Sequence, residues 1–345
     1  MLLDALSKVI DRQDLTRSEA EAVMDQIMDG MATPVQIGAY LTAMRMKGET
    51  VEEIIGSARA MRRKSIRIET GIDNLIDTCG TGGDGSCSLN ISTAAAFVLA
   101  AAGLPVAKHG NRSVSSRCGS ADVLMELGVD IEMDSEEAAA AIGKVGMAFL
   151  FAPVYHPAMR YAAPIRRELK VRSIFNVLGP LTNPAGARRQ LMGVFTKDLV
   201  VPLASALAGL GVESAMVVSG LSGFDEIATF EPTAVATVEN GTVTPWEIDP
   251  RDYGVFLEDQ SAITGGTVVQ NAEAIERIFS GEEGPFADIV ALNAGAGLVV
   301  GGLAQDIRCG IEMARSVMRS GSVLKKLKEV RLLSAETMEK RRSLP

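Results

Sequence analysis

The sequence is poor in the residues that build disulfide frameworks and basic binding surfaces. Its four cysteines include no C-x-x-C pair and no zinc-ligand spacing, so we expect reduced thiols. The net charge of −9 argues against a general binder of nucleic acids or membrane surfaces, which would normally be basic. No apolar run is long enough to cross a bilayer, and no basic segment precedes an apolar core near Met1. We therefore expect a soluble cytoplasmic protein.

Histidine is scarcer still, with only His109 and His156. No G-x-S-x-G motif surrounds a serine, which argues against a Ser/His/Asp hydrolase. A lone histidine is more often a structural hydrogen-bond partner than a catalyst, and whether either residue contacts a ligand stays open. Hydrophobic residues make up 47% of the chain. They supply a core for one large domain with a small one, or for two domains.

The first seventy residues carry helical patterns and no strand pattern. Apolar residues recur there at helical spacing, and glycines follow two of the expected helices. Capping threonines mark three helix starts: Thr16 with Glu19, Thr33 with Pro34, and Thr50 with Glu53. We expect a small helical domain over residues 1–70, whose apolar residues form a core and a subunit interface.

From residue 75 onward, strand-length apolar runs alternate with helical patterns. This alternation predicts an α/β fold with a mainly parallel sheet, assigned to a large domain of residues 71–161 and 190–345. Ligands of such folds bind at the carboxyl ends of the strands. After a short run at 75–76, the expected strands are 104–107, 146–151, 190–195 and 214–218, and the expected helices are 92–102, 120–127, 135–144 and 199–210.

Residues 158–189 interrupt the alternation. Two helical patterns, at 162–169 and 173–178, precede a rigid turn at 179–184. We expect this insertion to join the N-terminal helices, which would bring Arg166 to a cleft between the domains. Further along, Asn240-Gly241 between short apolar runs predicts a β-hairpin. The remaining expected helices are 271–280, 285–303, 306–319 and 322–328.

Residues 77–85, with the sequence DTCGTGGDG, form what we call the glycine loop. Its four glycines let the backbone curl with the N–H groups pointing inward, and the polar segment that follows leads into an alanine-rich helix. Unpaired amides at a helix start favour negative charge. Glycines between a strand and a helix often make only a tight turn, but this density of Gly, Thr, Ser and Asp favours phosphate binding.

A second polar cluster, KHGNRSVSSR, covers residues 108–117 directly after an apolar run. Its lysine, amide and hydroxyl groups suit the oxygens of a phosphate or sugar phosphate. A third cluster is the pair Asp225-Glu226, which follows another apolar run. Adjacent carboxylates usually lie in solvent, but near two anion-binding loops they suit Mg²⁺, which bridges carboxylates and phosphates.

In this order the clusters resemble those of the anthranilate phosphoribosyltransferases, the enzymes of the second step of tryptophan biosynthesis. The resemblance covers nearly the whole chain and is carried by the words GTGGDG (80–85), NIST (90–93), KHGNR (108–112), GSAD (119–122), GPLTNP (179–184) and DE (225–226). It implies transfer of the phosphoribosyl group of phosphoribosyl pyrophosphate (PRPP) to the amine of anthranilate. The family fold has a small helical domain and a large α/β domain.

The resemblance also implies site residues. Asp225, Glu226 and Ser92 would hold a pair of Mg²⁺ ions per subunit. Gly80, Asn111 and Arg166 would contact anthranilate, and His109, His156 and Pro180 would line its path. The residues implied for PRPP are Gly80, Gly83, Asp84, Ser88, Asn90, Ile91, Ser92, Thr93, Lys108, His109, Gly110, Asn111, Arg112, Ser113, Val114, Ser115, Ser116 and Ser120.

The family further implies a homodimer joined through the helical domain, with no nucleic-acid or membrane partner. This chain departs from the family pattern at Leu89, where an aromatic residue is general, at Cys118, where serine is common, and at Ser219, where histidine is frequent. None of these replaces an implied ligand. Two alternatives stay open: a pyrimidine nucleoside phosphorylase-like enzyme, and a non-enzymatic paralogue that binds nucleic acid. The first would carry a different glycine-loop word, and the second a basic groove with altered metal ligands.

Overall fold

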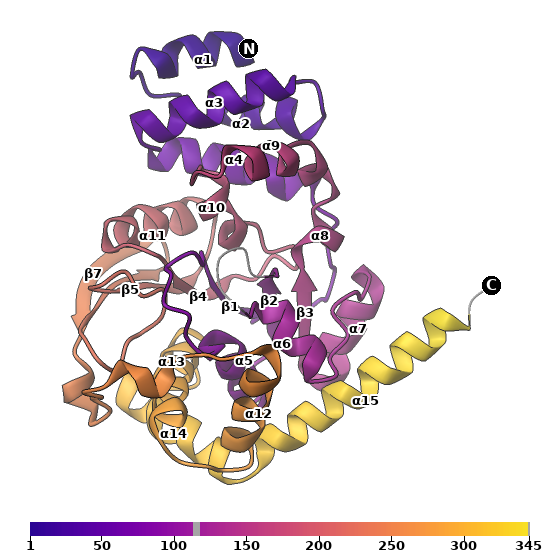
Figure 1. Ribbon diagram of the computed structural model, residues 1–345, viewed down its shortest axis with the longest axis vertical. Helices are drawn as coiled ribbons and strands as arrows, with labels where there is room; N and C mark the ends of the chain where they lie inside the picture. The colour runs from indigo at the N-terminus through magenta and orange to yellow at the C-terminus, as the bar shows by residue number, and fades with distance from the viewer. Residues whose placement is uncertain (113–117, 344–345) are drawn as a thin grey trace.

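The computed structural model describes residues 1–112 and 118–343 (Figure 1). A seven-stranded sheet crosses the described part in the order β3-β2-β1-β4-β5-β6-β7. Neighbouring strands are parallel from β3 to β5, and β6 and β7 add antiparallel pairs at one edge. The strands are β1 (Ile76–Gly80), β2 (Val106–Gly110), β3 (Met147–Phe151), β4 (Arg189–Gly193), β5 (Ser214–Gly220), β6 (Thr233–Glu239) and β7 (Thr242–Ile248). The predicted α/β fold with a mainly parallel sheet is confirmed.

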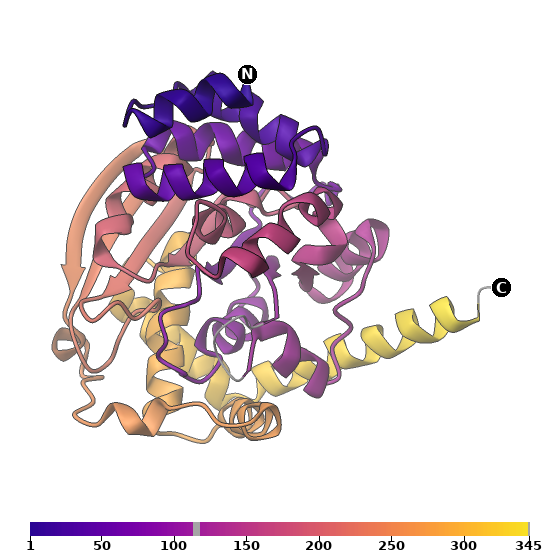
Figure 2. The ribbon, with the colours of Figure 1, turned by 45° about the horizontal axis from the view of Figure 1, so that its top comes forward.

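Four helices precede the sheet: α1 (Leu2–Ile10), α2 (Arg17–Met28), α3 (Pro34–Lys47) and α4 (Val51–Lys64). The expected caps are present, because Thr16, Thr33 and Thr50 each accept a hydrogen bond from the backbone N–H three residues later. In each case the side chain of that third residue closes the capping box. These helices form a layer at one end of the molecule (Figures 1 and 2).

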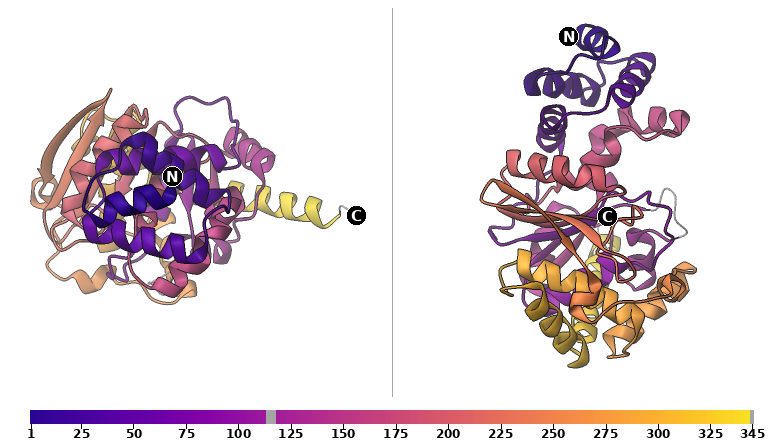
Figure 3. Two further views of the ribbon diagram at one scale, coloured as in Figure 1. Left: turned by 90° about the horizontal axis from the view of Figure 1, so that it is seen from above. Right: turned by 90° about the vertical axis from the view of Figure 1, so that its left-hand side faces the viewer.

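The two faces of the sheet are buried under different helices. Alternate strand residues such as Met216 and Val218 pack against α5 (Ile91–Ala101), α12 (Val268–Phe279), α13 (Pro285–Val300) and α14 (Ile307–Arg319). Their neighbours Ala215 and Val217 pack on the other face against α11 (Val200–Gly209) and the N-terminal helices. Figure 3 shows the sheet between these two groups of helices. Near β3, α6 (Ser120–Glu126) and α7 (Ser135–Val145) complete the packing.

The insertion between β3 and β4 lies against the N-terminal helices. It contains α8 (Ala152–Tyr155), the 3-10 helix η1 (Pro157–Tyr161), α9 (Ala163–Leu169), α10 (Phe175–Leu178) and the 3-10 helix η2 (Gly179–Thr182). Helix α9 packs on α3, and η2 packs on α4. Buried residues of the insertion, including Ile174 and Phe175, share one apolar cluster with α2, α3 and α4. The insertion thus links the helical layer to the edge of the sheet where β1 and β2 end.

Two strands continue into residues that the sequence placed in loops. Strand β1 takes in the first four residues of the glycine loop, and β2 takes in Lys108, His109 and Gly110. The expectation failed because it read polar residues as loop residues. Asp77 and Lys108 are buried in the sheet with hydrogen-bond partners that lie far away along the chain.

The end of the chain contains one confirmed and one wrong prediction. The hairpin is present, and Asn240 and Gly241 have φ values of 48° and 85°, as a tight turn between β6 and β7 requires. Helix α15 (Ser322–Arg342), however, continues far past the expected end at residue 328. Val323, Leu327, Val330 and Ser334 form one buried stripe, so packing continues the helix through a highly charged sequence. None of the helices in residues 1–112 and 118–343 could cross a membrane.

Candidate active site

The glycine loop, Lys108 and the acidic pair Asp225-Glu226 lie where the order of the strands in the sheet reverses. Strands β2 and β3 lie on one side of β1, whereas β4 and β5 lie on the other. In open parallel sheets, ligands bind outside the carboxyl ends of the strands at this switch point. The ends of β1 and β4 meet there, because the N–H of Thr81 donates to the carbonyl of Gly193 at 2.9 Å.

The glycine loop has a backbone that other residues would adopt with difficulty. Gly82, Gly83 and Gly85 have φ values of 62°, 76° and 76°. In the described part of the chain, the N–H groups of Gly83, Asp84 and Gly85 donate to no acceptor. The loop therefore leaves consecutive amides available to an anion.

The acidic pair lies against the glycine loop and against the start of α5. The N–H of Gly82 donates to Oδ2 of Asp225 at 2.8 Å, and the N–H of Ser92 donates to Oε1 of Glu226 at 3.1 Å. A Cβ at Gly80 would lie 2.7 Å from that same Asp225 oxygen, and one at Gly193 would lie 1.5 Å from the Asp225 carbonyl oxygen. Glycine at the ends of β1 and β4 is what lets the acidic pair come this close.

Negative charge at this point is concentrated and incompletely neutralised. Burial, together with Asp84 and Glu226, holds the pKa of Asp225 well above its usual range. Burial raises the pKa of Glu226 to about 7 despite the opposing charge of Lys108. Oδ2 of Asp84 is buried and accepts no hydrogen bond from the described residues. This donor set fits a divalent cation with oxygen ligands.

A complete protein cage for a metal is not present in the residues that the structure describes. No group of three or more His, Cys, Asp or Glu side chains there is arranged to hold an ion. Mg²⁺ commonly uses only one or two carboxylates and takes its other ligands from water and substrate phosphates. The pair therefore fits an ion whose coordination a phosphate ligand would complete.

Lys108 is buried beneath the site and already hydrogen-bonded. Its ammonium donates to the carbonyl oxygen of Thr78 and lies 3.3 Å from Oγ of Ser92. Burial lowers the pKa of Lys108, whereas Asp77 is first among the acidic groups that oppose this shift. The side chain thus places a positive charge below the glycine loop and fixes the first turn of α5, where Ile91 and Thr93 are also buried.

Asp77 joins three segments behind the site. Its two carboxylate oxygens accept hydrogen bonds from the N–H of His109 at 3.0 Å and from Nδ2 of Asn183 at 2.8 Å. The same Asn183 nitrogen donates to the carbonyl of Ala107 at 2.8 Å. Burial raises the pKa of Asp77 to about 6. This contact holds the turn at 179–184 against β1 and β2.

His109 and His156 are buried neighbours rather than surface groups. Their ring centroids are 5.1 Å apart, and Nδ1 of His109 lies 3.2 Å from the carbonyl oxygen of Gly179. Burial lowers the pKa of His109 to about 3 and that of His156 to about 4, so both rings are neutral near pH 7. Nε2 of each ring is buried and has no hydrogen-bond partner in the described chain.

The basic cluster is described only in part. Ser113, Val114, Ser115 and Ser116 lie outside the described residues. Before that gap, the carbonyl of Asn111 accepts a hydrogen bond from Oγ of Ser120 at 3.2 Å. Arg112 forms an ion pair with Asp122 at 3.2 Å, so its charge is already compensated. A Cβ at Gly110 would lie 2.7 Å from the ring of Phe149.

A support that the sequence did not reveal holds the segment between the glycine loop and α5. Ser88 pairs with Thr264 in an isolated antiparallel bridge. Nδ2 of Asn271, at the start of α12, donates to Oδ1 of Asn90 at 3.0 Å. Oδ1 of Asn271 accepts from the N–H of Gly266 at 2.7 Å. The first two of these contacts join residues more than 170 positions apart, and no local motif signals them.

Two arginines of the insertion, Arg166 and Arg172, differ in their contacts with the site. Arg166 lies over the ring of Phe175 at 5.3 Å and has no ion-pair partner among the described residues. No described contact joins it to the other predicted site residues. Arg172, which the sequence analysis did not single out, donates to the carbonyl of Gly83 at 2.5 Å and lies over the ring of Phe195 at 4.0 Å. Arg172 is thus the direct link from the insertion to the glycine loop.

Comparison with known proteins places the chain in a glycosyl transferase family. Residues 3–65 match the helical bundle domain of a glycosyl transferase family, and residues 72–324 match the α/β domain of that family. The anthranilate phosphoribosyltransferase of Acetivibrio thermocellus is 51% identical over 329 residues, which cover 95% of each chain.

Solved structures give the same result. The crystal structure of anthranilate phosphoribosyltransferase from Thermus thermophilus matches with a TM-score of 0.90 and 42% identity, covering 96% of this chain and 99% of that one. The Saccharomyces cerevisiae enzyme in complex with PRPP and Mg matches with a TM-score of 0.88 and 26% identity, covering 97% and 98%. The chain therefore belongs to the anthranilate phosphoribosyltransferase family. Membership of this family excludes both alternatives, the pyrimidine nucleoside phosphorylase-like enzyme and the non-enzymatic paralogue that binds nucleic acid.

Proposed function

We propose that the switch-point site transfers the phosphoribosyl group of PRPP to the amine of anthranilate with Mg²⁺, as the second step of tryptophan biosynthesis. The observation that carries this proposal is the double backbone contact of the acidic pair. Through Gly82 and Ser92, the carboxylates of Asp225 and Glu226 are held beside unpaired loop amides and a helix start. Cation ligands and anion donors thus lie together, as a metal-bound diphosphate needs.

In this proposal the diphosphate of PRPP lies along the glycine loop and the first turn of α5. Gly80, Gly83, Asp84, Ser88 and residues 90–93 contact it, and residues 108–116 with Ser120 complete the seat. The unpaired N–H groups of Gly83, Asp84 and Gly85 support this assignment, because the described chain supplies no acceptor for them and a diphosphate would. A relative from Saccharomyces cerevisiae has been solved with PRPP and Mg bound.

Asp225, Glu226 and Ser92 would hold Mg²⁺. The family resemblance implies two ions per subunit. The ion would neutralise charge that develops on the leaving pyrophosphate. Lys108 and the loop amides act in the same sense from the protein side, because both place positive charge near that group. The raised pKa values of the acidic pair support a cation partner.

Anthranilate would approach from the insertion, with Arg166 pairing its carboxylate and with Asn111 and Gly80 contacting it. Arg166 has an uncompensated charge among the described residues, which supports this role. His109 and His156 are neutral and buried beside η2, so they offer shape and a weakly polar wall rather than charge. Arg172 would hold the glycine loop in a fixed position relative to the insertion, through its hydrogen bond to Gly83.

The reaction needs positioning and electrostatics more than proton transfer. The lone pair of the neutral arylamine forms the new N–C1 bond, the C1–O bond to pyrophosphate breaks, and C1 inverts. An amine proton is lost to water after the attack. The transition state resembles an oxocarbenium ion, so donors that stabilise the departing oxygens lower the barrier. No strong general base is required, which agrees with two buried histidines whose lowered pKa values make them weak bases.

We also propose a homodimer joined through the helical layer, acting in the cytoplasm. Four exposed apolar side chains support the dimer: Leu3 and Ile10 on α1, and Val35 and Met46 on α3. Each pair is spaced so that both residues lie on one face of their helix. A set of this kind is typical of an interface.

Anthranilate fluorescence tests the proposed reaction. We expect the fluorescence of anthranilate to fall when PRPP and Mg²⁺ are both added to the purified protein, with pyrophosphate released in equal amount. Omission of PRPP is the control for photobleaching. A stable signal at saturating PRPP, Mg²⁺ and anthranilate would refute the proposal.

A further inference from the structure

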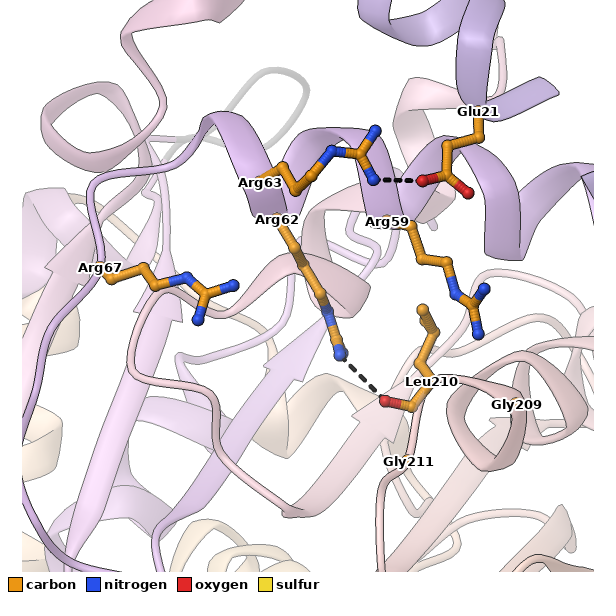
Figure 4. A pocket seen from close by; sticks show the side chains of 8 residues that line it. All are labelled: Glu21, Arg59, Arg62, Arg63, Arg67, Gly209, Leu210 and Gly211. Carbon is orange, nitrogen blue, oxygen red and sulfur yellow. Dashed lines mark hydrogen bonds and ion pairs between the residues drawn. The ribbon is translucent and has the colours of Figure 1, made fainter. Parts of the chain in front are cut away.

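A groove lined by arginines lies away from the switch-point site. It has a volume of about 540 Å³ and lies between α4 and the end of α11 (Figure 4). Helix α11 follows β4 and leads into β5, so its last residues lie near the amino ends of the strands. The proposed catalytic site is at the opposite, carboxyl edge of the sheet. The lining residues are Glu21, Arg59, Arg62, Arg63, Arg67, Gly209, Leu210 and Gly211.

The spacing of the arginines places them on one side of α4. Arg62 and Arg63 follow Arg59 by three and four positions, which brings each of them next to Arg59 on the helix surface. Arg67 follows just after the helix ends. Figure 4 shows the side chains of Arg59, Arg62 and Arg67 directed into the same open space.

Two of these arginines have structural roles. Arg62 donates to the carbonyl oxygens of Leu181 and Leu210, at 2.7 and 3.2 Å, and so ties α4 to η2 and to the end of α11. Arg63 pairs with Glu21 and Asp25. Basic residues in a last helical turn also complement the helix dipole. These roles account for Arg62 and Arg63 without any ligand.

Arg59 and Arg67 have no such account. Neither donates to a carboxylate or carbonyl of the described residues, and both are exposed at the rim of the groove. The lining holds four guanidinium groups and one carboxylate, and Asp25 also pairs with Arg63, so positive charge is in surplus by two on a protein whose net charge is −9. Burial, with repulsion from Arg59 and Arg67, lowers the pKa of Arg62 to about 10.

The groove also has room for a ligand beside these charges. Gly211 has a φ of 83°, and a Cβ there would meet nothing within 4 Å. Gly209 carries no side chain because a Cβ would lie 2.5 Å from Ile55. Gly209 thus lets α11 pack closely on α4, and Gly211 leaves the space at the end of α11 open beside the guanidinium groups.

We propose that this groove is a second anion site, which binds a small oxyanion of the phosphate type with several negative charges. Guanidinium groups recognise phosphate oxygens by paired N–H donation, and several of them around one pocket favour a multiply charged anion over a single carboxylate. A bound anion would bridge α4 and the end of α11 beside the Arg62 contacts. It would thereby strengthen the junction between the helical layer and the sheet.

Calorimetric titration with inorganic tripolyphosphate tests this site. The titration uses the full chain at low ionic strength with EDTA, so that no metal complex forms at the acidic pair. Three proteins are compared: wild type, Arg59→Ala/Arg67→Ala, and the control Lys340→Ala/Arg342→Ala. The control removes the same charge from the far end of α15, where both side chains are exposed. Any binding at the switch-point site is common to all three proteins.

We expect the groove variant to bind tripolyphosphate about tenfold or more weakly than wild type, or to lose one binding event. The control should bind as wild type does, and Arg59→Lys/Arg67→Lys should recover part of the affinity. Equal losses in the groove variant and the control would mean that only net charge matters, and would overturn the proposal. Unchanged affinity in the groove variant, or no binding by wild type, would overturn it as well.

Discussion

Gly80 is the residue at which the end of β1 comes closest to the acidic pair. Its missing side chain leaves 2.7 Å between the ideal Cβ position and Oδ2 of Asp225. That oxygen also accepts the hydrogen bond from Gly82. A methyl group at this point would push the carboxylate away from the loop, which connects a local backbone requirement to the proposed metal site.

We expect Gly80→Ala to lower kcat/KM by about a hundredfold while the melting temperature changes little, because a displaced charged group weakens transition-state stabilisation. Steady-state kinetics and thermal denaturation measure the two effects. Gly143→Ala is the matched control, since a Cβ there meets nothing within 4 Å. Activity of Gly80→Ala close to that of the control would show that this close approach does not matter.

His156 makes stability depend on pH. Its folded-state pKa of about 4 lies below the usual 6.5, so the unfolded chain binds the proton more readily. The contribution of His156 is fully present above pH 6.5 and is lost as pH falls toward 4. We expect His156→Gln to reduce the fall in the free energy of unfolding between about pH 6.5 and about pH 4.5 by up to about 1.4 kcal/mol per pH unit.

Urea denaturation across that pH range gives the slope for both proteins. His109 contributes in the same direction in both, because burial lowers its pKa to about 3. The comparison of slopes cancels any constant loss of packing. Identical slopes would contradict the account of His156 as a buried neutral group.

Site residues that belong to a recognisable motif were predictable from the sequence, whereas the residues that hydrogen-bond to them were not. The glycine loop and the acidic pair follow from residue types and their positions after strands. That Asp77 and Lys108 are buried within strands depends on partners such as Asn183 and Thr78. Local patterns carry no information on such long-range pairs, so polar residues were assigned to loops.

At the scale of elements, the segment that leads into α12 supports the proposed PRPP seat. Asn271 is buried and joins Asn90 to the backbone of Gly266. The bridge between Ser88 and Thr264 adds a backbone contact to the same loop. The segment preceding α5 is therefore held from a part of the chain far away in sequence.

We expect Asn271→Ala to raise KM for PRPP by about tenfold and to lower kcat less, because it loosens a binding segment without removing a charge. Initial rates at varied PRPP separate the two constants. Val269→Ala, at an exposed position of α12, is the control. A fall in kcat with unchanged KM would place Asn271 in a different role.

Helices and strands were predictable where a short sequence motif determines their ends, and not where tertiary contacts do. The capped helices α2, α3 and α4 and the Asn240-Gly241 hairpin follow from short motifs. Helix α15 was cut short because its length depends on tertiary contacts. One of these is the hydrogen bond that Oγ of Ser334 accepts from the N–H of Asp130 at 3.0 Å.

At the scale of the whole molecule, α1 and α3 present exposed apolar residues at the end that faces the viewer in Figure 3, left. Val35 is 81% exposed and Met46 is 71% exposed. We expect Val35→Glu/Met46→Glu to convert the proposed dimer into monomers in light scattering, because two carboxylates per subunit would be buried at the interface. Leu332→Glu on α15 is the control; equal masses for both variants would refute an interface here.

The boundaries of the two proposed domains stay a prediction, whereas the helical N-terminal part and the mainly parallel sheet are confirmed. Helical spacing in the first seventy residues, followed by strand-length apolar runs that alternate with helical patterns, predicts such a fold from the sequence alone. How the insertion closes on the sheet depends on side-chain contacts, such as those of Arg172 and Asn183, that periodicity does not encode.

The rate of anthranilate consumption as a function of Mg²⁺ concentration tests the central claim most directly. The comparison is between wild type and Asp225→Asn/Glu226→Gln at saturating PRPP. The account predicts that wild type depends on Mg²⁺ and that the variant, while still folded by circular dichroism, loses about a hundredfold or more in rate. Wild-type rates with an unchanged Mg²⁺ dependence in the variant would contradict it.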